Sequence, residues 1–143
     1  LLHFDPRICS NFFQRKVVAA GIAFVSAEHE YQYFKCNIAD QRERVTAILA
    51  DDTTPLEAKR IAGEAQREMP GGLRKKWQNI RLPVMYQVID DKFNQVGEFE
   101  QFLVDSRDGV HVEANAEDSF WGAGITRICR VGALSGSKHG PRG

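Results

Sequence analysis

The sequence predicts a mainly α-helical (α+β) fold, a compact single domain with a small β-hairpin or strand component. Three observations support this: several stretches begin with helix-capping residues, apolar residues recur at helical spacing, and only short segments have strand character. The chain has 143 residues, 43% hydrophobic and 27% charged. This composition fits one soluble domain with its own core, expected over residues 1–134, and a disordered tail over 135–143.

The first elements are a hairpin and a helix. "KVVAAGIAF" (16–24) contains two short apolar strands around Ala19–Gly21, which predicts a hairpin. Ser26 then caps a helix that runs to about Ile38. A second helix is expected over residues 40–50.

Residues 54–57, "TPLE", form a helix start with Thr54 as N-cap, Pro55 at the first helical position and Glu57 completing a capping box. "MPGG" (69–72) should end that helix. Later elements are expected as a helix from near Pro83 through "VMYQVIDDKFNQ", a short helix over 98–105, a strand over 109–115 and a glycine loop over 118–124.

The helix after Ser26 carries a polar stripe beside its apolar face. At about 100° per residue, the apolar face is formed by Ala27, Phe34 and Ile38, with Tyr31 at its edge. Glu28, Gln32 and Lys35 lie together next to that face, while His29, Tyr33 and Asn37 point elsewhere. Such a stripe is ordinarily a solvated surface, and a binding role requires partners elsewhere in the chain.

Two tryptophans are candidates for ligand stacking, although filling a core is the usual role of the residue. Trp77 follows three basic residues in "LRKKWQN". Trp121 lies in "DSFWGAG" just after Asp118, where Gly122 lets a ligand approach the backbone. Asn11, in "CSNFF", has a side chain that both donates and accepts hydrogen bonds.

Composition excludes several classes. Lys plus Arg equals Asp plus Glu at 19 each, so no global charge attracts nucleic acid or anionic membrane, and the short "RKKW" run favours a solvated surface. Three well-separated cysteines and no apolar run of membrane-spanning length indicate a cytoplasmic protein with free thiols. No metal-ligand spacing and no nucleotide-binding glycine motif occurs, so no metal and no cofactor is expected.

Six pieces, in order, resemble one family. They are "SNF", "EHEYQYFK", the "A-x-R-x-x-G" of Ala58, Arg60 and Gly63, "LRKKW", "KF" at 92–93, and "DSFWGAG". This order resembles the NADAR, or YbiA-like, family over roughly residues 9–124. The chain departs from it in having Glu30 where the family often has Tyr, and in ending "ITRICRVGALSGSKHGPRG" where the family continues into a Gly–Asn–Leu–Gly segment and a last helix.

The resemblance implies an N-glycosidase that hydrolyses the C1′–N bond of a ribosylated compound. Two substrate groups are implied: ADP-ribosylated guanine bases in nucleic acid, and ribosylaminopyrimidine intermediates of riboflavin synthesis. The matching positions are Glu28, Lys35 and Asp118 as catalytic residues, with Trp77 and Trp121 as substrate-binding residues. Asn11 lies in the "SNF" loop, and Gln32 and Gly122 are further candidates for substrate contact.

These residues suit the chemistry. Cleavage develops positive charge on the ribose, which a carboxylate from Glu28 or Asp118 stabilises or uses to activate water. Lys35 is either a nucleophile that forms a Schiff base with C1′ or a positive charge near a ligand phosphate. The alternative function is a non-catalytic ADP-ribose-binding module, favoured by the divergent C-terminal segment. No membrane partner is expected.

Overall fold

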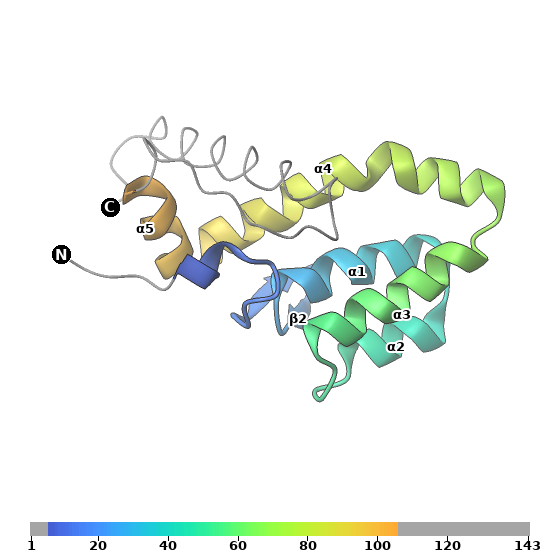
Figure 1. Ribbon diagram of the computed structural model, residues 1–143, viewed down its shortest axis with the longest axis horizontal. Helices are drawn as coiled ribbons and strands as arrows, with labels where there is room; N and C mark the ends of the chain where they lie inside the picture. The colour runs from blue at the N-terminus through green and yellow to red at the C-terminus, as the bar shows by residue number, and fades with distance from the viewer. Residues whose placement is uncertain (1–5, 106–143) are drawn as a thin grey trace.

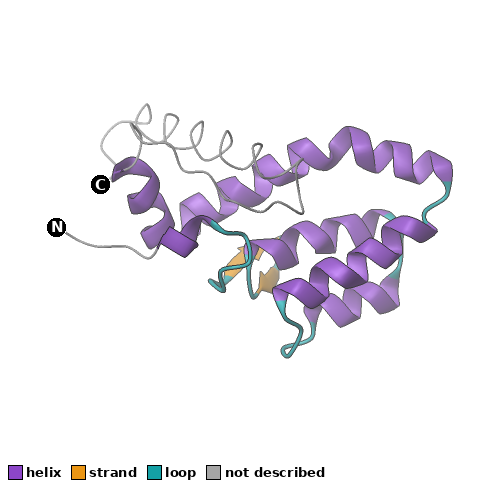
Figure 2. Ribbon diagram, in the orientation of Figure 1, coloured by secondary structure: helices purple, strands orange, loops and turns teal. Residues whose placement is uncertain are grey.

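The computed structural model describes residues 6–105, which form a mainly helical domain with one small antiparallel sheet (Figures 1 and 2). A 3₁₀ helix, η1 (Pro6–Cys9), precedes the strands β1 (Val17–Ala19) and β2 (Ile22–Phe24). The α-helices are α1 (Ala27–Ile38), α2 (Arg42–Leu49), α3 (Pro55–Glu68), α4 (Gly71–Gln95) and α5 (Gly97–Asp105). The expected mainly α fold is confirmed. The strand, glycine loop and tail expected after residue 108 lie outside the described residues.

The hairpin prediction is confirmed. β1 and β2 pair antiparallel, with Val17 opposite Phe24 and Ala19 opposite Ile22. The turn residues Ala20 and Gly21 have φ angles of 53° and 75°, as a two-residue hairpin turn with both central residues left-handed requires. The hairpin is held against α4 by Gln95, whose carboxamide pairs with both the N–H and the carbonyl of Val18 at 2.7 Å each.

The two predicted helix caps are present. Ser26 Oγ accepts a hydrogen bond from the His29 N–H at 3.2 Å, and Thr54 Oγ1 accepts from the Glu57 N–H at 3.1 Å. Each bond satisfies a donor that the first turn of a helix leaves without an intrahelical partner. These caps fix where α1 and α3 begin.

The expected helix start near Pro83 is wrong, because α4 begins at Gly71 and Pro83 lies inside it. A proline inside a helix removes one backbone hydrogen bond and costs about 3 kcal/mol. Pro83 lies on the exposed side of α4, while Trp77 and Met85, on either side of it in sequence, are each 1% exposed in the core. Burial of large side chains outweighs the lost bond.

Helix α1 lies between two packed layers, with α4 on one side and α2 and α3 on the other (Figure 1). A large core cluster joins α1 to η1, α4 and α5. A smaller cluster, formed by Cys36, Ile48, Ala58, Ala62 and Ala65, joins α1 to α2 and α3. Because α1 is covered on both sides, most of its polar residues are buried.

This arrangement corrects one expectation for α1. His29 was expected to point away from the core, whereas it is 1% exposed. The reason is that α2, α3 and the chain between them cover the side of α1 that the helical wheel assigns to solvent. Asn37 is exposed, as expected.

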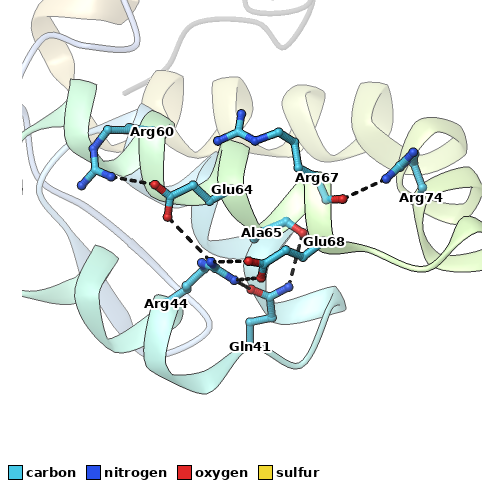
Figure 3. Close-up of polar contacts among 8 residues, drawn as sticks. All are labelled: Gln41, Arg44, Arg60, Glu64, Ala65, Arg67, Glu68 and Arg74. Carbon is cyan, nitrogen blue, oxygen red and sulfur yellow. Dashed lines mark hydrogen bonds and ion pairs between the residues drawn. The ribbon is translucent and has the colours of Figure 1, made fainter.

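A polar network on the surface joins the second layer together (Figure 3). Arg44 of α2 forms ion pairs with Glu68 and, at 3.7 Å, with Glu64 of α3. Arg60 adds an ion pair to Glu64 at 2.9 Å within α3. Arg74 of α4 donates to the Arg67 carbonyl at 3.0 Å, so it satisfies an acceptor that the end of α3 leaves open. These contacts hold α2 and α3 in place beneath α1.

Candidate functional site

The first group of candidate residues gathers where the loop after η1 meets the start of α1. The Glu28 N–H donates to the Asn11 carbonyl oxygen at 2.9 Å, which joins the loop to the helix. One turn later, Gln32 Nε2 donates to Glu28 Oε1 at 2.7 Å. Glu28 is 6% exposed, Gln32 2% and Asn11 3%, so this polar group is packed inside the protein. The stripe predicted for α1 is therefore not a solvated face.

Two carboxamide oxygens in this group accept no hydrogen bond from residues 6–105. Asn11 Nδ2 donates to the Met85 sulfur at 3.3 Å, but Asn11 Oδ1 accepts no hydrogen bond within the described part of the chain. Gln32 Oε1 likewise accepts no hydrogen bond from residues 6–105. Buried acceptors without donors are uncommon in folded proteins and require a physical explanation.

Lys35 and Trp77 form a second group, joined to the first through α1. The Lys35 ammonium lies 5.5 Å from the centroid of the Tyr31 ring and 5.6 Å from that of Trp77. The two rings contact each other with centroids 5.3 Å apart. Contacts between a cation and aromatic faces are electrostatically favourable. Lys35 is 8% exposed and Trp77 only 1%, so the indole belongs to the core as well as to this group.

The structure thus places five of the predicted site residues in two neighbouring groups on or against α1. Asn11, Glu28 and Gln32 form one group, and Lys35 with Trp77 forms the other. Asp118, Trp121 and Gly122 lie outside the described residues, and their roles stay predictions.

Lys92 of α4 was not among the predicted site residues, although it holds the segment that carries Asn11. Its ammonium donates to the carbonyl oxygens of Ile8 and, at 2.9 Å, of Ser10, and lies 4.4 Å from the centroid of the Phe99 ring. Lys92 is 1% exposed. It therefore fixes the segment that carries Asn11. The "KF" pair at 92–93 was the available signal, but sequence alone gave the lysine no partner.

His29 adjoins Glu28 in sequence but plays a different part. Its Nε2–H donates to the Thr53 carbonyl at 2.8 Å, and its Nδ1 accepts from the Ser26 hydroxyl at 2.7 Å. This pairing assigns the neutral tautomer, in which one ring nitrogen donates and the other accepts. Burial lowers the pKa of His29 below its usual value, and the bond to Thr53 only partly opposes this. His29 joins α1 to the chain before α3 and has almost no surface for a ligand.

Glu30 is a second residue that the predictions did not include. Its side chain is fully buried, and neither of its carboxyl oxygens accepts a hydrogen bond within residues 6–105. Burial raises the pKa of Glu30 to about 9, and a hydrogen bond to the Asp91 carboxylate and the charge of that carboxylate add to the effect. This raised pKa favours the neutral, protonated form of Glu30 at physiological pH.

Among residues 6–105, no three His, Cys, Asp or Glu side chains are grouped as ligands for a metal ion. The Cys36 thiol is buried, and this burial raises its pKa to about 11, which makes it a poor nucleophile and a poor metal ligand. Over the same residues, none of the helices combines the length and apolar character needed to cross a bilayer.

Comparison with known proteins agrees with the fold and with the resemblance. Residues 5–139 match the NADAR domain. In three dimensions, the NMR structure of the Escherichia coli protein YbiA superimposes with a TM-score of 0.74 and 22% sequence identity, covering 95% of this chain and 82% of YbiA. This structural likeness shows a shared helical fold.

Curated relatives include proteins with two kinds of name. The chain is 29% identical over 115 residues to "N-glycosidase YbiA" of Shigella flexneri, which covers 80% of this chain and 67% of that protein. It is 32% identical over 101 residues to the chloroplastic riboflavin biosynthesis protein PYRR of Zea mays, covering 69% of this chain but only 16% of the maize protein. The chain belongs to the NADAR domain family.

Proposed function

We propose that this protein is an N-glycosidase that hydrolyses the C1′–N bond of a ribosylated compound. The relatives named N-glycosidase support the reaction type. The observation that carries the proposal is the buried Glu28 carboxylate, oriented by Gln32 and held beside Asn11 at the start of α1. A fixed carboxylate in a largely dry setting is what stabilisation of a developing positive charge requires.

In this mechanism the Glu28 carboxylate lies beside C1′ of the ribose. As the C1′–N bond breaks, its electron pair leaves with the nitrogen and C1′ becomes positively charged. Glu28 stabilises that charge and accepts a proton from the water whose oxygen bonds to C1′. The leaving nitrogen takes a proton from solvent, and Glu28 returns its proton to solvent, so one water is consumed and the carboxylate is restored. The products are the free sugar and the free amine or base.

For Lys35 we propose an electrostatic role. The Lys35 ammonium lies against the rings of Tyr31 and Trp77, and these contacts hold a positive charge in place beside α1. The charged side chain then attracts a ligand phosphate. Trp77 positions Lys35 through the same contact.

The substrate is one of two kinds: an ADP-ribosylated guanine base in nucleic acid, or a ribosylaminopyrimidine phosphate related to riboflavin synthesis. The riboflavin names among the relatives support the second kind for those proteins. We keep both, since each presents a ribose joined to nitrogen.

The test is to incubate the protein with an oligonucleotide carrying ADP-ribosylated guanine and, separately, with a ribosylaminopyrimidine phosphate. Release of ADP-ribose or of ribose 5-phosphate identifies the activity. Glu28→Gln should reduce the rate about a hundredfold or more, the scale of one general base. Glu43→Gln, an exposed glutamate on α2, is the matched control. Retention of ADP-ribose without release would instead identify a binding module, and equal rates for both variants would exclude Glu28.

Borohydride separates the two roles of Lys35. With the wild type and either substrate, we expect no covalent ribosyl adduct. A trapped adduct that disappears in Lys35→Met, but persists when the exposed Lys76 is changed to Met, would show that Lys35 is the nucleophile.

A further inference from the structure

We infer that Asn11 and Gln32 make this site selective for a ribose that keeps its 2- and 3-hydroxyl groups, because each carboxamide has a buried oxygen that accepts no hydrogen bond from residues 6–105. This inference rests on the proposed function, since it assigns the sugar of that reaction to particular atoms. It adds a discrimination between ribose and deoxyribose that the family relationship does not provide.

The orientation of Gln32 is set by Glu28. Its nitrogen donates to Glu28 Oε1 at 2.7 Å. Turning the carboxamide over would place its oxygen against the carboxylate oxygen, which is repulsive while Glu28 is ionised. The nitrogen therefore faces Glu28, and Oε1 accepts no hydrogen bond from residues 6–105.

The orientation of Asn11 is set by Met85 of α4. Its nitrogen donates to the thioether sulfur at 3.3 Å. A thioether accepts hydrogen bonds and cannot donate them, so the reverse orientation would oppose oxygen to sulfur. Lys92, by fixing the Ser10 carbonyl, holds the adjoining backbone in place. Oδ1 of Asn11 is therefore fixed as an acceptor.

The two carboxamide oxygens are therefore buried acceptors that receive no hydrogen bond from residues 6–105. A buried acceptor without a donor costs about 1–3 kcal/mol, so a ligand that supplies donors is favoured. Ribose hydroxyls are such donors. Ionised phosphate oxygens are acceptors only, so a phosphate cannot satisfy the oxygens of Asn11 and Gln32.

An exocyclic amine of the leaving base would also satisfy these oxygens, and a ligand without a base separates the two cases. Ribose 5-phosphate contains the sugar and phosphate of both proposed substrates. Its 2-deoxy and 3-deoxy analogues each lack one hydroxyl. We would measure the affinity of all three by isothermal titration, first with the wild type.

We expect each deoxy analogue to bind the wild type at least about tenfold more weakly than ribose 5-phosphate, as loss of one buried hydrogen bond predicts. Asn11→Leu and Gln32→Met remove one acceptor each at similar volume. Each should weaken ribose 5-phosphate about tenfold and should abolish the discrimination against one of the two analogues. Gln78→Met, an exposed carboxamide on α4, should change nothing.

Equal affinity of the wild type for ribose 5-phosphate and both analogues would overturn the inference, and so would absence of binding. The comparison of ligands on the wild type remains valid if a variant does not fold. Binding also separates this inference from the proposed reaction. A protein that prefers ribose but cleaves neither substrate retains the selectivity and refutes the N-glycosidase. A protein that cleaves a substrate but binds ribose 5-phosphate and both deoxy analogues equally supports the N-glycosidase and refutes the selectivity.

Discussion

Replacing Glu30 by Gln should remove a pH-dependent cost from the stability of the protein. Glu30 is fully buried beside Asp91, and its pKa is raised from 4.5 to about 9. Between these values the folded protein keeps a proton that the unfolded chain releases. The contribution of protonated Glu30 to the free energy of unfolding is therefore fully present below pH 4.5 and is lost as pH rises towards 9.

The magnitude follows from the number of protons. One proton retained only by the folded state reduces the free energy of unfolding by about 1.4 kcal/mol for each pH unit. From about pH 5 to about pH 8 the loss is at most about 4 kcal/mol. Gln has nearly the same shape and does not ionise.

The assay is urea denaturation of wild type and Glu30→Gln at several pH values. We expect the two stabilities to be similar near pH 5 and to diverge by several kcal/mol near pH 8, with the variant more stable. Titration of His29 affects both proteins alike and cancels in the difference. Glu43→Gln serves as the exposed control. Parallel curves for wild type and Glu30→Gln over the whole range would refute the reasoning.

Other predictions concern the core, the histidine and the surface. Trp77→Ala should lower the free energy of unfolding by about 3–5 kcal/mol, measured by urea denaturation, because it removes a large buried side chain. The lowered pKa of His29 means that stability is present above about pH 6.5 and declines as pH falls below that value, and His29→Gln should weaken this decline in urea titrations at pH values on both sides. Arg44→Ala should leave the melting temperature nearly unchanged in thermal denaturation, because ion pairs at the surface contribute little to stability. A large fall in the melting temperature would show that the network in Figure 3 is structurally essential.

Sequence patterns predicted the elements whose ends are determined locally. The caps at Ser26 and Thr54 and the hairpin turn at Ala20–Gly21 each depend on a few adjacent residues. The start of α4 is not determined by adjacent residues alone. Leu73, Trp77 and Ile80 recur at helical spacing before Pro83, but "PGG" and the proline carry strong local signals against a helix. Packing against α1 decides the outcome, and packing is not visible in local sequence.

The candidate site was predictable in part for the same reason. The spacing of Glu28, Gln32 and Lys35 follows from the helix that contains them. The hydrogen bond from Glu28 to Asn11 joins separate elements, and only the resemblance to a family pointed to Asn11. The partners of Lys92 and of Glu30 lie on other elements, so nothing in the linear pattern distinguished these residues from solvated charges.

The bond between Lys92 and Ile8 spans 84 residues of sequence, and this separation has a consequence for the order of folding. Contacts between distant segments form late, because closing a long loop costs entropy before the contact repays it. The cluster of α1, α2 and α3 is built from neighbouring segments and needs no such closure. The site should therefore mature last, after α4 docks on the N-terminal loop. The Glu28 amide, whose bond to Asn11 exists only when that loop is seated, should exchange its hydrogen with solvent at the rate at which α4 and the loop separate.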